Sequence, residues 1–244
     1  MNEFSLNGKK ILVTGASSGI GKQAAILASN NGAELFITGR DKARLEETFA
    51  LLGPGDHSMH LADLTVAEEM DALVAILPKL DGIVHCAGIV GPLPAKFILQ
   101  EHIDKMFAIN YMVPVNLTSK LLRAKNVADH ASILFMSTIA TRNPYFGGAL
   151  YSGSKAALEA YAKTLALEHV AKGIRANFLM AGLVDTPMIV SPSEENMQAE
   201  ALERYLKRYP LGVGEAKDVA ATVLFFLSDA SKWISGTSLI LGGE

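Results

Sequence analysis

Tyr151 and Lys155 are the residues of this sequence best suited to move a proton. Tyr151 opens a stretch with helical apolar periodicity that continues to about His169, so both side chains should share one helix face, four residues apart. An ammonium group held beside a phenol favours the phenolate and lowers the pKa of the phenol. Such a phenol can exchange a proton with a carbonyl or alcohol oxygen near neutral pH. By itself the spacing is common, and a half-buried tyrosine beside a lysine that extends to solvent would produce it equally well.

A glycine-rich turn near the N-terminus is the second feature with chemical meaning. Gly15, Gly19 and Gly21 follow a short apolar run at residues 10–13 and precede a helical pattern that ends at about Asn30. Residues without side chains let a backbone turn tightly and approach a pyrophosphate, whose charge then meets free amides at a helix N-terminus. An ordinary loop can also be rich in glycine, so the position between a strand and a helix carries the prediction of a dinucleotide site.

Seven short, largely apolar runs alternate with longer helical patterns along the chain. We place the strands at residues 10–13, 34–38, 58–62, 82–86, 132–138, 175–180 and 238–241. Runs that are apolar almost throughout indicate strands buried on both faces. Their alternation with helices predicts an α/β fold, a single-domain Rossmann-type doubly wound parallel seven-stranded sheet with helices on both faces.

Helix-start residues mark the segments between these strands. Asp41 should cap a helix over residues 42–51, and Thr65 with Glu68 forms a capping-box pattern before a helix over residues 67–77. Because no Pro-, Gly- or Ser-rich linker and no repeat divides the sequence, we expect one dinucleotide-binding catalytic domain over residues 1–244. Residues 187–210 are polar and amphipathic, and we expect them to form a lid over the substrate.

Composition describes a globular protein and excludes several classes of partner. Half of the 244 residues are hydrophobic and 19% are charged. With a net charge of -3, a pI near 6.1 and no run of Lys or Arg, the chain offers no basic surface to nucleic acid or to anionic lipid. No apolar stretch approaches membrane-spanning length, and residues 1–10 lack the core of a signal peptide. The single cysteine, Cys86, allows no internal disulfide and suggests no metal site, so we expect a cytoplasmic protein.

Three motifs together resemble one protein family. They are the string Thr14-Gly15-Ala16-Ser17-Ser18-Gly19-Ile20-Gly21, the pair Ser137-Thr138 at the end of the fifth strand, and Tyr151 with Lys155. Their order and spacing are those of the short-chain dehydrogenase/reductase family. The resemblance extends from Gly15 to Gly243 and is closest in overall pattern to 3-oxoacyl-[acyl-carrier-protein] reductases. It implies an oxidoreductase that interconverts a carbonyl and a secondary alcohol by hydride transfer from a nicotinamide cofactor.

The resemblance assigns four catalytic roles. Tyr151 is the general acid in the direction of reduction, and Lys155 lowers its pKa and binds the nicotinamide ribose. Thr138 stands where the family has a serine that orients the substrate oxygen; threonine keeps the hydroxyl but has a stiffer χ1, and Ser137 is the alternative hydroxyl. Asn110 falls where the family has an asparagine that holds a water in a proton path, although a mid-helix asparagine can also simply bond a neighbouring backbone carbonyl.

The resemblance also implies a set of cofactor contacts. They are Gly15, Ser17, Ser18, Gly19, Ile20, Gly21, Arg40, Asp63, Leu64, Cys86, Ala87, Gly88, Asn110, Tyr151, Lys155, Gly182, Val184 and Thr186. Asp63 would lie near the adenine, or else start the following helix beside Thr65. Two positions depart from the family pattern: Cys86 replaces an asparagine and so removes a polar contact, and Ala181 replaces a proline and so frees a fixed φ angle.

The end of the second strand carries the signal for cofactor choice. An acidic residue there would accept the ribose 2′-hydroxyl of NAD, and a basic residue would favour the 2′-phosphate of NADP. The family's acidic position aligns with Gly39, Arg40 follows it, and Asp41 comes one residue late and should cap the next helix. We therefore expect NADP, with NAD as the alternative; Arg40 could also be a solvated loop cation.

The sequence leaves the substrate open. The candidate pocket walls, residues 92–97, 143–146 and 183–209, mix apolar and aromatic side chains without clustered cations. A polyol, a steroid, an acyl-carrier-protein thioester and a small ketone all remain candidates for the small-molecule substrate. The family's typical tetramer, packed through helices equivalent to residues 113–125 and 150–170, implies a homo-oligomer.

Two other functions compete with this interpretation. A non-catalytic dinucleotide-sensing protein of the same fold is the main alternative, but it should have lost the tyrosine or the lysine. An epimerase or dehydratase of nucleotide sugars usually needs a larger C-terminal substrate domain than this sequence offers.

Overall fold

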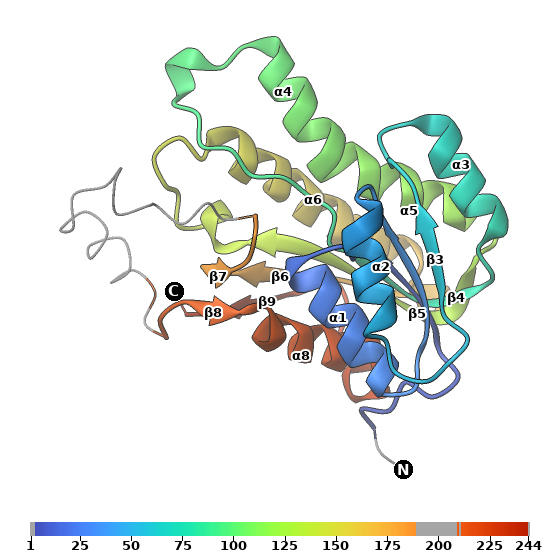
Figure 1. The fold of residues 1–244 in the computed structure, drawn as a ribbon. Helices are drawn as coiled ribbons and strands as arrows, with labels where there is room; N and C mark the ends of the chain where they lie inside the picture. Colours follow the sequence, from blue (N-terminus) through green and yellow to red (C-terminus); the bar gives the residue numbers. More distant parts are fainter. Residues whose placement is uncertain (1–2, 189–208, 210, 244) are drawn as a thin grey trace.

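The chain folds as a parallel sheet between two layers of helices (Figure 1). The computed structural model describes residues 3–188, 209 and 211–243. Seven strands pair in the order β3-β2-β1-β4-β5-β6-β9, and every pairing between neighbours is parallel. The strands are β1 (Lys10–Thr14), β2 (Glu34–Gly39), β3 (Ser58–Leu61), β4 (Leu80–His85), β5 (Val127–Thr138), β6 (Arg175–Ala181) and β9 (Ser238–Leu241). The doubly wound Rossmann-type fold predicted from the sequence is therefore confirmed.

Helices cover both faces of this sheet. One layer holds α1 (Gly19–Asn30), α2 (Lys42–Ala50) and α8 (Ala216–Leu227). The other holds α3 (Ala67–Ile76), α4 (Gln100–Phe107), α5 (Val113–Arg123) and α6 (Ala149–Glu168). A π-helical turn, η2 (Ala108–Met112), joins α4 to α5, and short 3-10 turns lie at Ala95–Phe97, Ile139–Thr141, Val170–Lys172 and Asp229–Ser231.

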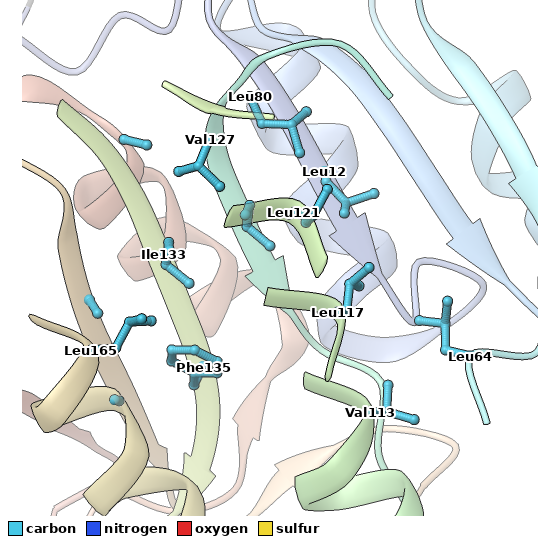
Figure 2. Close-up of a cluster of buried hydrophobic side chains, with 14 of the residues drawn as sticks. Leu12, Leu64, Leu80, Val113, Leu117, Leu121, Val127, Ile133, Phe135 and Leu165 are labelled. Carbon is cyan, nitrogen blue, oxygen red and sulfur yellow. The ribbon is translucent and has the colours of Figure 1, made fainter. Parts of the chain in front are cut away.

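Alternate side chains of the central strands fill two apolar cores. Leu12, Ile133 and Phe135 point toward α5 and α6, where they pack with Leu117 and Leu165 in the cluster of Figure 2. Their neighbours along the strands face α1 and α8 instead, and belong to the second cluster; they include Ile11, Val13 and Leu134. Because successive strand residues point to opposite faces, strands that are apolar throughout can supply both cores. Because both faces of the central strands are packed, the positions of the strand ends are fixed, and with them the residues that follow each strand.

Most predicted strand boundaries hold to within two residues, and the exception is the start of β5. That strand begins at Val127 rather than at Ser132. The polar residues Asp129 and His130 interrupt the apolar run, so the pattern did not predict the first residues of the strand. The backbone is irregular at the same place: His130 has a positive φ of 64°, and the register with β4 shifts between Leu80 and Gly82. The sequence also missed two strands of two residues each, β7 (Val184–Asp185) and β8 (Gly214–Glu215), which pair in parallel as a separate small sheet.

The two predicted helix starts have different outcomes. Asp41 caps α2 as expected, because its side chain accepts a hydrogen bond from the backbone N of Arg44 at 3.1 Å. The capping box of Thr65 and Glu68 is wrong. Thr65 Oγ1 donates to Asp63 Oδ1 at 2.6 Å instead, and the carboxylate that reaches back is that of Glu69, which accepts from the backbone N of Asp63 at 2.7 Å. The helix starts at Ala67 as predicted, but its N-cap is Val66 rather than Thr65, so the third helical position falls on Glu69.

The predicted lid over residues 187–210 lies outside the described residues, apart from Pro187, Met188 and Tyr209. It therefore stays a prediction. Among the helices that the structure describes, none combines the length and the apolar character needed to cross a bilayer.

Candidate active site

A cleft of about 680 Å³ lies at the carboxyl ends of the strands. It opens where the strand order reverses, between β1 and β4, which is the usual place for a ligand in a doubly wound sheet. Seventeen of the eighteen predicted cofactor contacts line this cleft, and so does Thr138; only Asn110 lies buried behind the wall. The fold thus brings together residues from loops that are far apart in the sequence.

The glycine turn forms one wall of the cleft by close backbone contact. Gly15 has a φ of +65°, and a Cβ atom there would lie 2.7 Å from the backbone N of Ala87. A Cβ atom on Gly21 would lie 2.3 Å from the carbonyl oxygen of Gly15. Ser18, the residue before α1, makes no side-chain capping bond within the described part of the chain, so the first amides of α1 stay available to an anion. This cradle fits a pyrophosphate.

Substitution of Gly21 tests this packing. Gly21→Ala should abolish dinucleotide binding and lower the free energy of unfolding by about 1–3 kcal/mol, the usual cost of overpacking, because its methyl group has no room beside the carbonyl of Gly15. Gly153→Ala is the matched control, since no described atom lies within 4 Å of the added methyl group. Because Gly153 lies inside α6, past its first turn, this replacement should stabilise the protein by up to about 1 kcal/mol. Isothermal titration with NADPH and thermal unfolding measure both effects, and equal binding by the two variants would contradict the account.

Tyr151 and Lys155 project from the first turns of α6 onto the end of β5. Lys155 is 5% exposed, and its ammonium donates to the carbonyl oxygen of Met136 at 2.9 Å. The Tyr151 hydroxyl is hydrogen bonded with the side chain of Thr138, whose oxygen also accepts from the backbone N of Ala140 at 3.2 Å. The Ser137 hydroxyl donates to Glu159 instead. Of the two neighbouring hydroxyls, the structure thus places that of Thr138 beside Tyr151.

Burial sets the protonation of this pair. Burial raises the pKa of Tyr151 to about 12, and the hydrogen bond from Thr138 only partly offsets this effect. Burial also lowers the pKa of Lys155 to about 8. The residue pattern predicted a tyrosine pKa below its usual value. The pKa lies above that value instead, because removal of the phenol from water dominates. At neutral pH the phenol therefore carries its proton, and the lysine is charged.

Asn110 links the site to the π-helical turn η2. It is fully buried; its Oδ1 accepts from the backbone N of Ile89 at 2.8 Å, and its Nδ2 donates to the carbonyl oxygen of Ile89 at 2.9 Å. A Cβ atom on Gly88 would lie 3.1 Å from Asn110 Oδ1 and 3.4 Å from Lys155 Nζ. The Asn110 amide and the Lys155 ammonium thus both lie against the backbone of Gly88. The Asn110 amide holds the loop after β4 in place. Its two hydrogen bonds to the backbone of Ile89 therefore account for the position of this side chain, as the second interpretation of Asn110 predicted.

Cys86 lines the cleft, and its neighbour His85 is buried in the sheet; neither side chain is charged. Burial raises the pKa of the Cys86 thiol to about 12, so the thiol stays protonated. Burial, aided by the charge of Lys155, lowers the pKa of His85 to about 3, and its ring stacks on Phe135 with centroids 4.9 Å apart. Both side chains are neutral at physiological pH, and Cys86 behaves as a small apolar residue.

Two ion pairs lie at the end of the cleft that adjoins β2 and α2. Arg40 Nη1 lies 3.5 Å from Asp63 Oδ2, and Arg44 Nε lies 3.2 Å from Asp41 Oδ2. Asp63 also accepts from the backbone N of Thr65 at 2.9 Å, so it both faces the cleft and shapes the turn before α3. The Arg40 side chain is 60% exposed and can turn toward a ligand.

The loop after β6 closes the cleft over the glycine turn. Val184 is held by its pairing with Gly214 in the small β7–β8 sheet. A Cβ atom on Gly19 would lie 3.3 Å from the Thr186 side chain. Ala181, where the family has proline, ends β6 and is buried, and the backbone N of Gly182 donates to Leu241 O at 2.9 Å. Sheet pairing therefore restrains this loop without the proline.

The residue pattern did not reveal two groups near the pair, the carbonyl that binds Lys155 and the carboxylate that binds Ser137. The carbonyl of Met136 is a backbone group, which a residue pattern does not reveal. Glu159 stands four residues after Lys155, on the same face of α6, and that spacing was a signal for its position.

The parallel sheet, the glycine cradle and the pair of Tyr151 with the buried Lys155 define a nicotinamide-dependent oxidoreductase. The family model described as enoyl-(acyl carrier protein) reductase matches residues 15–243. The chain belongs to the short-chain dehydrogenase/reductase family, and it is an enzyme of that NAD(P)-dependent family.

Similar proteins span nearly the whole chain. A glucose 1-dehydrogenase from Gluconobacter oxydans is 30% identical over 97% of this chain and 91% of its own length. A 3-oxoacyl-[acyl-carrier-protein] reductase from Rickettsia felis is 30% identical over 98% of both chains. Among solved structures, a short chain dehydrogenase/reductase family protein superposes with a TM-score of 0.85 at 29% identity, again over 98% of both chains. These relatives differ in the substrates that their names state.

Proposed function

We propose that this protein is an NADPH-dependent reductase that interconverts a carbonyl and a secondary alcohol, with Tyr151 as the proton donor and acceptor. The observation that carries the proposal is the grouping of the Tyr151 phenol, the Thr138 hydroxyl and the buried Lys155 ammonium at one end of a cleft whose wall is the glycine cradle. NADPH, when bound, supplies the hydride.

Each residue of the group has a distinct task in reduction. The Thr138 hydroxyl orients the substrate oxygen, and Tyr151 donates its proton to that oxygen as negative charge develops there. Because burial keeps the phenol protonated, Tyr151 is ready to act as an acid at neutral pH. Lys155 supplies positive charge to the ribose hydroxyls and to the tyrosinate that forms. Asn110 holds the loop after β4 in place behind the lysine through its two hydrogen bonds to Ile89.

Arg40 is the residue that we assign to the 2′-phosphate of NADPH. It lines the cleft at the end of β2, and Asp41 is occupied as the cap of α2. Arg40→Ala should weaken NADPH binding about tenfold, within the range for a hydrogen-bonded charge, because Asp63 already neutralises part of the arginine charge. NADH binding should stay the same. Lys42→Ala is the control, since Lys42 is paired with Glu46 and does not line the cleft.

Calorimetric titration of these proteins with NADPH and NADH tests the assignment. Preference for NADPH that is lost in Arg40→Ala and kept in Lys42→Ala would support it. Equal affinity of the unmodified protein for both cofactors would overturn it and favour a dual-cofactor enzyme.

The walls near Tyr151 favour an apolar ketone over a charged one. Pro92, Asn143, Tyr145 and Leu183 line the cleft on the side of the tyrosine. The tetramer, the lid, the division into one domain and the cytoplasmic location remain predictions from the sequence.

A further inference from the structure

Glu159 is the third side chain in a row on the catalytic face of α6. Tyr151, Lys155 and Glu159 are spaced by four residues, so they lie one above the next on this face. Each makes a hydrogen bond to one residue at the end of β5: Tyr151 to Thr138, Lys155 to the carbonyl of Met136, and Glu159 to the hydroxyl of Ser137. The proposed function uses the first two contacts and leaves the third without a role.

The Glu159 carboxylate holds the chain on both sides of Thr138. One oxygen, Oε1, accepts from the Ser137 hydroxyl, immediately before Thr138. The same oxygen lies 3.0 Å from Thr141 Oγ1, which is also 3.1 Å from the carbonyl oxygen of Thr138. The carboxylate thus connects α6 by hydrogen bonds both to the end of β5 and to the 3-10 turn Ile139–Thr141 that follows it.

Strand geometry explains why this tie orients Thr138. Successive side chains of a strand point to opposite faces, and Thr138 still has extended backbone angles, with φ of -151° and ψ of 148°. Because the Ser137 side chain is directed to Glu159, the Thr138 side chain leaves the chain in another direction and meets Tyr151 in the first turn of α6. Glu159 does not line the cleft, so it cannot touch a substrate held there.

We infer that Glu159 is a positioning residue, which holds the Thr138 hydroxyl against Tyr151 and engages the Ser137 hydroxyl in a hydrogen bond. The inference rests on the proposed function. A residue that acts in this way affects the rate of the chemical step more than the binding of the cofactor, because small displacements of an orienting group misalign the substrate oxygen.

Two replacements of Glu159 separate positioning from folding. Glu159→Ala removes both hydrogen bonds and should lower kcat for ketone reduction by about tenfold to 100-fold, with little change in NADPH affinity. Glu159→Gln keeps an acceptor oxygen at the same place and should restore most of kcat. Glu168→Ala is the control, because Glu168 lies on the same helix with an exposed side chain and should have no effect.

A double variant keeps the test valid if Glu159→Ala fails to fold. Ser137→Ala with Thr141→Val removes both partners of the carboxylate without altering α6, and should lower kcat to a similar extent. Single-turnover oxidation of NADPH with a ketone panel, NADPH titration and thermal unfolding should be measured on each protein.

Three outcomes would overturn the inference, and they differ from one another. If Glu159→Ala keeps the kcat of the unmodified protein, Glu159 has no positioning role and the proposed function stands. If kcat falls only in step with NADPH affinity, the role of Glu159 is structural. If the unmodified protein binds NADPH but reduces none of the ketones, the proposed function itself fails, and the positioning role with it.

Discussion

Replacement of Tyr151 by phenylalanine should lower kcat for carbonyl reduction by about 100-fold to 10,000-fold, the contribution typical of a positioned general acid. The phenyl ring fills the same buried space, so folding and NADPH affinity should change little. The loss follows because the phenol, whose pKa burial raises to about 12, is the group that delivers a proton to the substrate oxygen. Steady-state kinetics and NADPH titration on the same preparation measure the two effects.

Tyr161→Phe is a closely matched control for this variant. Tyr161 lies on the same helix, burial raises its pKa to about 12 as well, and its hydroxyl is hydrogen bonded to Thr118. Its ring packs edge-on against Phe135 with centroids 5.8 Å apart, and it does not line the cleft. The variant should lose about 1 kcal/mol of stability through the hydrogen bond and keep its kcat. A Tyr151→Phe enzyme as active as Tyr161→Phe would refute the role of Tyr151.

Replacement of Lys155 by alanine should damage binding and turnover together. Lys155 is buried and lines the cleft, and charged hydrogen bonds contribute about 1.5–3 kcal/mol, so NADPH affinity should fall by about tenfold or more. Turnover should fall at least as far as in Tyr151→Phe, since the tyrosinate loses its neighbouring charge. Lys163→Ala, on the exposed side of α6 over the ring of Phe178, should change neither quantity.

The pH dependence of NADPH binding gives a second test of Lys155. Burial lowers the pKa of this lysine to about 8, so its charge is complete below that pH and is lost as the pH rises through it. NADPH affinity should therefore fall between about pH 8 and pH 10, a range in which an exposed lysine would stay charged. Lys155→Ala should show no such fall, and a fall of the same size in both proteins would assign it to another group.

The fold was predictable because strands buried on both faces have a distinctive apolar sequence pattern. Strands such as β1 and β6, apolar along their whole length and flanked by helical periodicity, admit few arrangements other than a covered parallel sheet. The β7–β8 pair and the first residues of β5 were not predictable, because two-residue strands carry no periodicity and Asp129 with His130 interrupts the apolar run.

The candidate site was predictable in its residues and not in its electrostatics. Spacing shows that Tyr151 and Lys155 share a helix face, but the direction of their pKa shifts depends on how deeply the fold buries them. In the same way, the sequence Ser137-Thr138 offers two hydroxyls, and only the contacts of Glu159 and Ala140 show which of them turns toward Tyr151. Burial and the direction of a side chain are products of tertiary packing.

Transfer of deuterium from labelled NADPH to a ketone shows whether this protein reduces a carbonyl with Tyr151 as the proton donor. The protein is incubated with NADPH that carries deuterium at the transferred position of the nicotinamide, together with a panel that includes a β-ketoacyl thioester, a steroid ketone and a small ketone, and the products are analysed by mass spectrometry. The account predicts a secondary alcohol with one deuterium on the carbinol carbon, formed by the unmodified protein and by Tyr161→Phe but not by Tyr151→Phe. Tight NADPH binding without deuterated alcohol from any ketone would contradict it, and would indicate a protein that binds the dinucleotide without using it.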